Sequence, residues 1–177
     1  MKQSIFMLYI LIMLLTGCAS ISTKQLISIA ENKQAVVLGS CYLARSFTLC
    51  DATWRNEQNQ TQVTFGIKSQ VQVLEPSTYS LSGFISDKGW FPTVVRSIAN
   101  LRNIASFSIK GGDVLYIGNL EFDISKSFSI HHAINVIDNK NSAEQYLSKY
   151  QPKLLPRLQT RLIQLSPEVL AIKKSVE

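Results

Sequence analysis

Residues 62–67 read QVTFGI, and their polar and apolar side chains alternate. This period of two is typical of a half-buried β-strand, because successive side chains of a strand point to opposite faces of its sheet. The alternation continues through residues 70–73 and returns at residues 79–84, beyond a turn at residues 75–77 that contains proline. Residues 35–43 (AVVLGSCYL) predict an earlier strand. Closely spaced short strands of this kind predict a mainly β domain.

A hairpin is expected around the residues KGGD at positions 110–113. Strand-like segments at residues 106–109 and 114–122 flank them, and glycine supplies the positive φ of a tight turn. A further strand is expected at residues 127–137. Together these strands predict an antiparallel β-sandwich-like domain over residues 34–140, followed by a helical segment, in an α+β arrangement.

Two segments have the spacing of a helix. Residues 93–105 (TVVRSIANLRNIA) place apolar side chains three and four apart. Residues 141–177 are expected to be helical, and five leucines would share one helical face: Leu154, Leu155, Leu158, Leu162 and Leu165. Pro152 and Pro156 would split this segment into two helices or kink it, and Pro167 would end it.

The composition is that of a globular protein. The 177 residues carry a net charge of +6, with 46% hydrophobic and 17% charged residues. This length fits one domain, or two at most. No apolar run reaches the ~18 residues that a membrane-spanning helix needs, so the body of the protein is not expected to be integral to a membrane.

The N-terminus has the pattern of an export signal. Residues 5–15 form an unbroken apolar stretch of 11 residues after the basic Lys2. This is the length of the apolar part of a signal peptide and is too short to span a bilayer. Small residues then lead to a cysteine, in the order Leu15, Thr16, Gly17, Cys18. Residues 1–17 are therefore expected to be a signal peptide.

The motif that ends at Cys18 resembles the lipobox of bacterial lipoproteins. The resemblance implies that the chain is cut before Cys18, that a diacylglyceryl group is attached to its thiol, and that the new amino group is acylated. It also implies that Ala19 permits sorting to the outer membrane of a diderm bacterium, on the periplasmic face. Residues 18–33, which are mostly polar and small, would be a lipidated tether containing at most a short helix. The alternative is an ordinary secretory peptide whose cleavage zone contains a cysteine.

Cys41 and Cys50 remain as an even pair in an exported chain, which predicts one disulfide. Such a bond would stabilise the fold by roughly 2.5–3 kcal/mol on the chain-entropy model. The alternative is two buried free thiols. The sequence has no Cys or His spacing of a zinc site, and we expect no metal and no cofactor.

A second resemblance covers residues 34–137. Residues 76–81 (PSTYSL) and 111–118 (GGDVLYIG) look like a pattern shared by small exported β-sandwich domains, many of them uncharacterised bacterial lipoproteins, although Ser77 stands where glycine is usual. The resemblance implies a fold and no activity. A structural role is sufficient for Tyr79 and Tyr116, whose rings can be buried while the hydroxyls bond to the backbone.

Few side chains offer catalytic chemistry. His131 and His132 are the only histidines, and neighbours in a strand point to opposite faces, so they are poor partners for one metal ion. Glu121 and Asp123 would share a strand face. A glycosidase uses such a pair of carboxylates on either side of the glycosidic bond that it cleaves. A solvated pair of like charges is the simpler interpretation. No catalytic motif is present, and the sequence is interpreted as that of a protein that is not an enzyme.

Four basic residues of the tail recur every four positions: Lys149, Lys153, Arg157 and Arg161. On a helix they would form a slanted basic stripe beside the leucines. Such a stripe could bind the headgroups of an anionic membrane or an acidic partner. The interpretation that we favour is a solvated face of a helix that docks through its leucines. Nucleic acid is not an expected partner, because a basic net charge alone is a weak signal.

The sequence thus predicts a lipid-anchored protein of the cell envelope, with a structural or protein-interaction role, whose partners are the membrane and another envelope protein. Two alternatives remain open. A large apolar pocket would favour a protein that binds a small or lipidic ligand. A concave site holding Glu121, Asp123 or a histidine would favour a cell-wall hydrolase.

Overall fold

The computed structural model describes residues 21–44, 48–66, 70–88, 91–93, 104–122 and 134–174. The helices are α2 Thr23–Ala30, α4 Lys140–Tyr150, the short 3₁₀ helix η2 Leu155–Arg157, and α5 Pro167–Lys174. The first strands are β1 Ala35–Leu43, β2 Thr48–Asn56, β3 Gln62–Phe65, β4 Val71–Leu74, β5 Ser77–Lys88 and β6 Phe91–Thr93. The later strands are β7 Ala105–Ile109, β8 Val114–Phe122, β9 Ile134–Ile137, β10 Leu158–Thr160 and β11 Gln164–Leu165.

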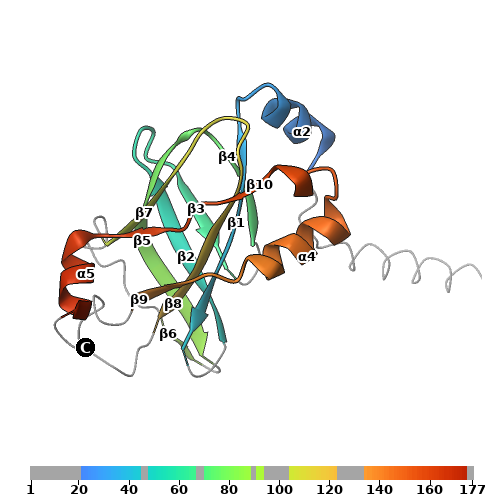
Figure 1. The fold of residues 1–177 in the computed structure, drawn as a ribbon. Coiled ribbons are helices and arrows are strands. Elements are labelled where there is room, and N and C mark those ends of the chain that lie inside the picture. The colour runs from blue at the N-terminus through green and yellow to red at the C-terminus, as the bar shows by residue number, and fades with distance from the viewer. Residues whose placement is uncertain are drawn as a thin grey trace, which may run out of the picture.

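The strands form two sheets that meet along two sides (Figure 1). One sheet contains β10, β8 and β1, with β4 and β9, and the other contains β2, β5, β7 and β11, with β3 and β6. The hairpin of β1 and β2 joins the sheets on one side, and the segment at residues 158–165 joins them on the other by adding β10 to β8 and β11 to β7. The prediction of a mainly β fold with a C-terminal helix is confirmed. The first sheet is mixed rather than antiparallel, because β8 runs parallel to both β1 and β10.

The predicted hairpin at residues 106–122 is wrong. β7 pairs with β5 and β11, whereas β8 pairs with β1, β9 and β10, so the turn at residues 110–113 carries the chain from one sheet to the other. A Cβ at Gly111 would lie 1.7 Å from the carbonyl oxygen of Asn32, and Gly112 has a φ of 82°. The two glycines therefore permit a close approach to the chain before β1, where the Gly112 N–H donates to the Gln34 carbonyl at 2.8 Å.

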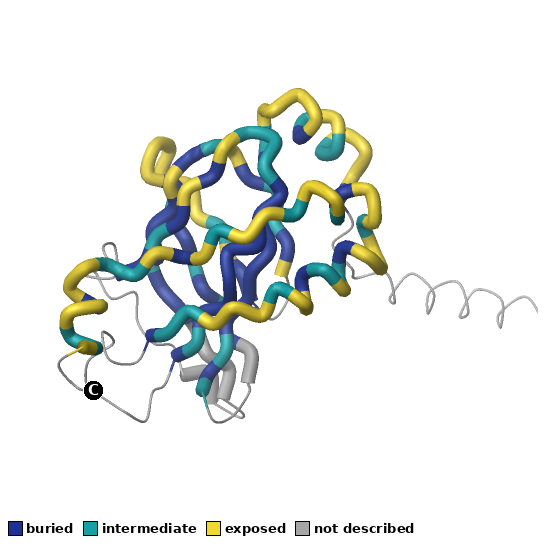
Figure 2. The backbone as a smooth tube through the Cα atoms, viewed as in Figure 1, coloured by how far each residue is buried: buried dark blue, intermediate teal, exposed yellow. Residues whose placement is uncertain are grey.

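An inner core fills the space between the two sheets, which appear buried in Figure 2. Aromatic rings make up its centre, with centroids 4.9 Å apart for Trp54 and Phe107 and 5.3 Å apart for Tyr79 and Phe107. At the other end of the core, Phe84 stacks on Phe122 at 4.0 Å. These rings supply much of the apolar area that holds the sheets together.

A second core lies outside the first sheet, under α2, α4 and η2 (Figure 1). β1 is consequently covered on both faces, and eight of its nine residues are buried. The predicted tether does not extend over the whole of residues 18–33. Ser22 caps α2 in a capping box with Gln25, and Ile29 is completely buried in this second core. The folded domain therefore includes the chain from Ile21 onward.

The predicted C-terminal helical segment at residues 141–177 is also wrong over its middle part. α4 ends at Tyr150, and beyond Pro152 and Pro156 the chain becomes β10, whose Leu158 pairs with Val114 of β8. The backbone there bonds to a neighbouring strand rather than to its own turns, with the Ile163 N–H donating to the Ile117 carbonyl at 2.8 Å. The leucines are divided accordingly. Leu154, Leu155 and Leu158 belong to the second core, Leu165 packs on the inner core, and Leu162 is exposed.

Pro167 begins α5 instead of ending a helix, which suits proline because the first helical N–H has no partner in its own helix. The helix predicted at residues 93–105 falls mainly outside the described residues, but Thr93 belongs to β6 and Ala105 to β7. The strand predicted at residues 127–137 is described only as β9. Within the described part of the chain, no helix combines the length and apolar character needed to cross a bilayer.

Candidate functional site

A bulge in β8 creates the most distinctive local feature of the first sheet. Leu38 of β1 pairs with Tyr116 and Ser40 pairs with Asn119, so β8 has one residue more than β1 between these pairs. The extra residue is accommodated at Gly118, whose φ of 86° is in the left-handed region. Glycine is required there, because a side chain would be strained by this φ.

The bulge changes which side chains face the inner core. Before it, Leu115 and Ile117 point between the sheets, and after it Leu120 and Phe122 do so. Asn119 consequently lies on the outer face of the sheet, the same face as Tyr116, toward α4. An asparagine is thus placed beneath a helix in the middle of a buried strand.

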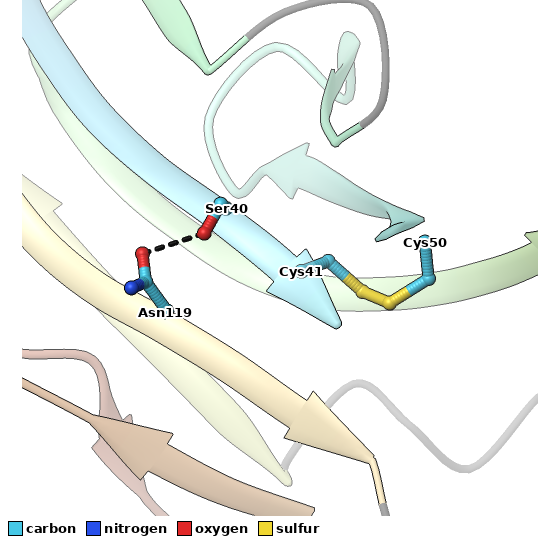
Figure 3. The surroundings of a disulfide bond; sticks show 4 residues. All are labelled: Ser40, Cys41, Cys50 and Asn119. Carbon is cyan, nitrogen blue, oxygen red and sulfur yellow. Dashed lines mark hydrogen bonds between the residues drawn. A yellow bond between two sulfur atoms is a disulfide. The ribbon is translucent and has the colours of Figure 1, made fainter. Parts of the chain in front are cut away.

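Asn119 forms a hydrogen-bonded pair with Ser40 across β8 and β1 (Figure 3). The Ser40 hydroxyl donates to Asn119 Oδ1 at 2.6 Å, and the exposed fractions of the two residues are 8% and 2%. Asn119 Nδ2 is buried and has no hydrogen-bond partner among the described residues. Ser40 can satisfy only one end of the amide, so one polar atom of Asn119 is left over in either orientation of the group.

A cleft of about 70 Å³ lies over this pair, between the first sheet and α4. Its lining residues share one property, the absence of a carboxylate, imidazole, thiol, ammonium or guanidinium group: Leu38, Gly39, Ser40, Tyr42, Gln70, Val71, Tyr116, Asn119, Ser142, Ala143 and Tyr146. The cleft is therefore uncharged, with polar groups at Ser40, Gln70, Asn119 and Ser142 and both apolar and tyrosine side chains around them.

Tyr116 fixes the start of α4 beside the cleft. Its hydroxyl accepts from the Asn139 N–H at 2.7 Å and lies 3.4 Å from the Ile137 carbonyl, to which it donates. Burial raises the pKa of Tyr116 to about 12, so the phenol is neutral at physiological pH. The predicted burial of the Tyr116 ring, with its hydroxyl bonded to backbone, is confirmed.

The predicted disulfide is confirmed. Cys41 and Cys50 are bonded, with a Cα–Cα distance of 5.0 Å, and both are completely buried. Cys41 follows Ser40 in β1 and belongs to the inner core, while Ser40 lines the cleft. Figure 3 shows the disulfide beside the Ser40–Asn119 pair. The disulfide therefore ties β2 to the strand that carries Ser40, close to the cleft.

A second buried asparagine, Asn56 at the end of β2, has all of its side chain engaged. Its Oδ1 accepts from the N–H groups of Gln58 at 2.8 Å and Asn59 at 3.2 Å and from the Ser77 hydroxyl at 2.8 Å. Its Nδ2 donates to the Tyr79 hydroxyl at 3.2 Å. That hydroxyl donates to the backbone carbonyl of residue 75 at 3.0 Å, as expected for Tyr79. Asn56 therefore fixes the turn after β2.

The predicted basic stripe does not form, because its four residues do not lie on one helix. Lys149 is in α4, with its ammonium 4.9 Å from the Tyr150 ring centroid, and Lys153 follows α4 on the surface. Arg157 donates to the Gly112 carbonyl at 2.6 Å. Arg161 donates to the Ser108 carbonyl at 3.0 Å and pairs with the carboxylate of residue 113 at 3.4 Å. Both arginines thus hold the turn between β7 and β8.

Other residues singled out in the sequence are placed only in part. Glu121 is half-buried and accepts from Asn135 Nδ2 at 3.1 Å, and the Lys173 ammonium donates to Asn135 Oδ1, so Glu121 belongs to a contact between β8, β9 and α5. It does not line the cleft. Three further candidates lie outside the described residues: Cys18, Asp123 and the pair His131 and His132. The described residues hold no cluster of three metal-binding side chains.

A wider depression of about 410 Å³ lies on the second sheet beside the start of α5. It is lined by Glu57, Thr78, Ser80, Ser106, Gln164, Leu165, Ser166 and Pro167. The one carboxylate in it, Glu57, accepts a hydrogen bond from the Ser80 hydroxyl. The Glu57 carboxylate is thus engaged with Ser80 of β5.

The sequence interpretation did not single out Ser40, Asn119, Tyr42 or Tyr146. One signal for Asn119 was present, since Gly118 and Asn119 interrupt the otherwise apolar centre of residues 114–120. Glycine inside a strand is typical of a bulge, and bulges often redirect a side chain at a functional site. The unpartnered amide itself depends on tertiary contacts that the sequence does not contain.

No protein-family model and no curated protein matches this chain. Among solved structures, the fold is similar to part of a leucine-rich repeat protein from Bacteroides thetaiotaomicron, at 14% identity and a TM-score of 0.35. The match covers 52% of this chain and 14% of that protein. A likeness at this TM-score supports no conclusion about function.

Proposed function

We propose that this protein is a lipid-anchored component of the bacterial cell envelope that acts by binding, without catalysis. The observation that carries the proposal is the sequence Leu15, Thr16, Gly17, Cys18 directly after an apolar stretch of signal-peptide length. The Cys41–Cys50 disulfide supports it, because structural disulfides form and persist in exported proteins. Two or three acyl chains on Cys18, at ~0.8 kcal/mol per buried CH₂, would give a stable anchor.

The start of the folded domain supports a close attachment to the membrane. Ile21 is packed in the second core and is 8% exposed, so only two residues, Ala19 and Ser20, separate it from Cys18. The three Cα–Cα steps from Cys18 to Ile21 span at most about 10 Å. Lipid on Cys18 would therefore hold the side of the domain that carries α2 and α4 near the bilayer surface, where Ala19 favours the outer membrane and its periplasmic face.

The properties of the cleft support a binding role over a hydrolytic one. Its lining lacks the carboxylate, imidazole or thiol that could transfer a proton or attack a bond. Glu121, half of the carboxylate pair considered for a hydrolase, is engaged with Asn135 away from the cleft. A structural or interaction role in the envelope is the function that agrees with these contacts.

The binding of a small molecule is the second candidate function, and the cleft is the observation that favours it. Its volume of about 70 Å³ is less than half of the ~150 Å³ cavity that accepts a benzene molecule. It is therefore too small for an acyl chain, and Ser40 and Asn119 give it polar groups. A small polar group fits this candidate better than a lipidic ligand does.

Metabolic labelling with radioactive palmitate tests the anchor. The wild-type protein should be labelled and Cys18→Ala should not, because the thioether needs the thiol of residue 18. The double variant Cys41→Ser/Cys50→Ser is the matched control and should keep its label, since it retains Cys18. Equal labelling of the wild type and Cys18→Ala would overturn the proposal.

A further inference from the structure

α2 has one face in the second core and one face in solvent. Leu26 and Ile29 pack in the second core. Ile27 is at the centre of the other face, which also holds the exposed Lys24 and Ala30. Ile27 is 54% exposed, more than any other large hydrophobic side chain among the described residues. An isolated exposed isoleucine is common on protein surfaces, so its place in the chain and the charges around it decide what it can contact.

The exposed face of α2 lies close to the proposed lipid anchor. Thr23, the first residue of α2, is five positions after Cys18. Five residues span at most about 18 Å, and a helix of eight residues is about 12 Å long. The burial of Ile21 in the second core removes further slack. Ile27, in the middle of α2, is therefore within reach of the bilayer that would hold the lipid.

The layer that contains α2 is also positively charged. Residues 21–34 and 140–157, which include α2, α4 and η2, contain six basic and two acidic residues and so carry four of the six net positive charges of the chain. Both acidic residues are paired with lysines, at 2.7 Å for Glu31 and 3.1 Å for Glu144. The excess positive charge belongs to the other four basic residues: Lys24, Lys149, Lys153 and Arg157.

Tyr150 adds an exposed aromatic side chain to this layer. It is the last residue of α4, is 40% exposed, and has the Lys149 ammonium 4.9 Å from its ring centroid. Tyrosine and lysine both have an apolar body and a polar tip, which suits them to the headgroup region of a membrane. The layer thus combines positive charge with exposed apolar groups, the two components of a surface that lies on an anionic bilayer.

We propose that α2 docks on the anionic phospholipid headgroups of the bilayer that holds the Cys18 lipid, with Ile27 inserted among them and Lys24 beside the phosphates. The second core keeps the helix fixed to the domain through Leu26 and Ile29. The docking rests on the proposed lipid anchor, and it adds which surface meets the bilayer and which class of lipid that surface selects. Because the anchor raises the effective concentration of the bilayer near α2, even a weak contact is populated.

Fluorescence quenching in the lipidated protein, reconstituted into vesicles, tests the docking. Ala30→Cys carries a nitrobenzoxadiazole label beside Ile27. Ala171→Cys is the matched control, because it is also an exposed alanine on an eight-residue helix, α5, next to the exposed Leu170. Figure 1 shows α2 and α4 on one side of the molecule and α5 on the opposite side.

The vesicles contain phosphatidylcholine, phosphatidylglycerol and a lipid with a nitroxide quencher. This lipid should quench the label at residue 30 and not the label at residue 171, because the apolar face of an interfacial helix is buried about 5–10 Å into the headgroup boundary. Vesicles without phosphatidylglycerol should quench the label at residue 30 less, since each cation near an anionic surface favours the docked state by about fivefold.

Two pairs of variants at exposed positions, each made with the label at residue 30, separate the apolar contact from the charge. Ile27→Glu should abolish the quenching, and its control Leu170→Glu should leave it unchanged. Lys24→Glu should lower the ratio of docked to undocked α2 by roughly fivefold or more. Its control Lys174→Glu makes the same change in net charge on α5 and should have no effect.

Flotation of the same vesicles distinguishes failure of the docking from failure of the anchor. Protein that does not float would overturn the anchor and the docking together. Protein that floats with equal quenching at residues 30 and 171, or with quenching that survives Ile27→Glu, would overturn the docking and leave the anchor in place. Quenching that is independent of phosphatidylglycerol and of Lys24→Glu would contradict the selection of anionic lipid.

Discussion

Asn56 and Asn119 are the same residue type, both lie on strands, and their exposed fractions are 1% and 2%. Their surroundings differ. The Asn56 side chain makes four hydrogen bonds, to two backbone N–H groups, a serine and a tyrosine. The Asn119 side chain makes one with Ser40 and has an unpartnered Nδ2 among the described residues. Two asparagines that are equally buried therefore differ in how far the fold satisfies their polar atoms.

The difference follows from what lies beside each residue. Asn56 is followed by its own turn at residues 57–61, whose backbone supplies donors within reach. Asn119 lies after a bulge and beneath α4, where Ser40 bonds to its Oδ1 and Nδ2 has no partner among the described residues. The fold therefore uses both ends of the Asn56 amide and only one end of the Asn119 amide.

The largest expected effect is at Asn56. Asn56→Leu should lower the free energy of unfolding by about 3 kcal/mol, because it removes four hydrogen bonds and leaves the buried hydroxyls of Ser77 and Tyr79 without this partner. Urea unfolding followed by circular dichroism measures the change. Gln58→Ala, at an exposed position in the same turn, is the control and should change the value by less than about 0.5 kcal/mol. A loss below about 1 kcal/mol for Asn56→Leu would show that the hydrogen bonds of Asn56 contribute no more to stability than the single bond of Asn119.

The disulfide beside Ser40 gives the next largest effect. Cys41→Ala/Cys50→Ala should lower the free energy of unfolding by roughly 2.5–3 kcal/mol, since the bond no longer restricts the unfolded chain. Urea unfolding of the wild type with and without a reducing agent measures the same quantity independently. The reducing agent should shift the midpoint of the wild type and leave that of the double variant where it is. A double variant as stable as the oxidised wild type would show that the disulfide between β1 and β2 does not stabilise the fold.

A smaller effect concerns two buried tyrosines, Tyr79, which bonds to Asn56, and Tyr116, which lines the cleft. Burial raises the pKa of Tyr116 to about 12 and also raises that of Tyr79. Because the folded pKa lies above the unfolded value near 10, both phenols are neutral in both states below that pH, and their contribution to stability is fully present there. As the pH rises from about 10 toward 12, ionisation favours the unfolded chain and stability falls.

Tyr116→Phe isolates one of these groups, because it removes the Tyr116 ionisation and leaves Tyr79 and the lysines in place. The free energy of unfolding, measured at intervals from about pH 9 to about pH 11.5, should fall less steeply for the variant than for the wild type. Identical slopes would contradict the raised pKa of Tyr116.

Much of the fold was predictable where local pattern determines it. The alternation at residues 62–67 and 79–84 correctly indicated β3 and β5, and the residues 35–43 indicated β1. Cys41 and Cys50 were predictable as a pair because an exported chain seldom leaves two thiols free. In each case the sequence pattern and the strand or disulfide that it predicts lie within a few residues of one another.

The wrong predictions share a physical cause, which is pairing between distant segments. The glycines 111 and 112 suit a hairpin, but β8 pairs with β1 and β10, so the turn joins two sheets. The leucine spacing of residues 154–165 suits a helix, but β10 gains backbone bonds from β8. The cleft was missed for the same reason, since two of its polar residues, Ser40 and Asn119, are 79 positions apart.

The most direct test of the central claim is the stability of Asn119→Leu relative to that of Asn56→Leu, with both measured by urea unfolding of the full chain. Leucine is close to asparagine in shape, removes the unpartnered Nδ2, and loses only the bond to Ser40. We predict that Asn119→Leu changes the free energy of unfolding by less than about 1 kcal/mol. A loss at Asn119 as large as that at Asn56 would contradict this account, because it would show that the fold itself uses the whole amide.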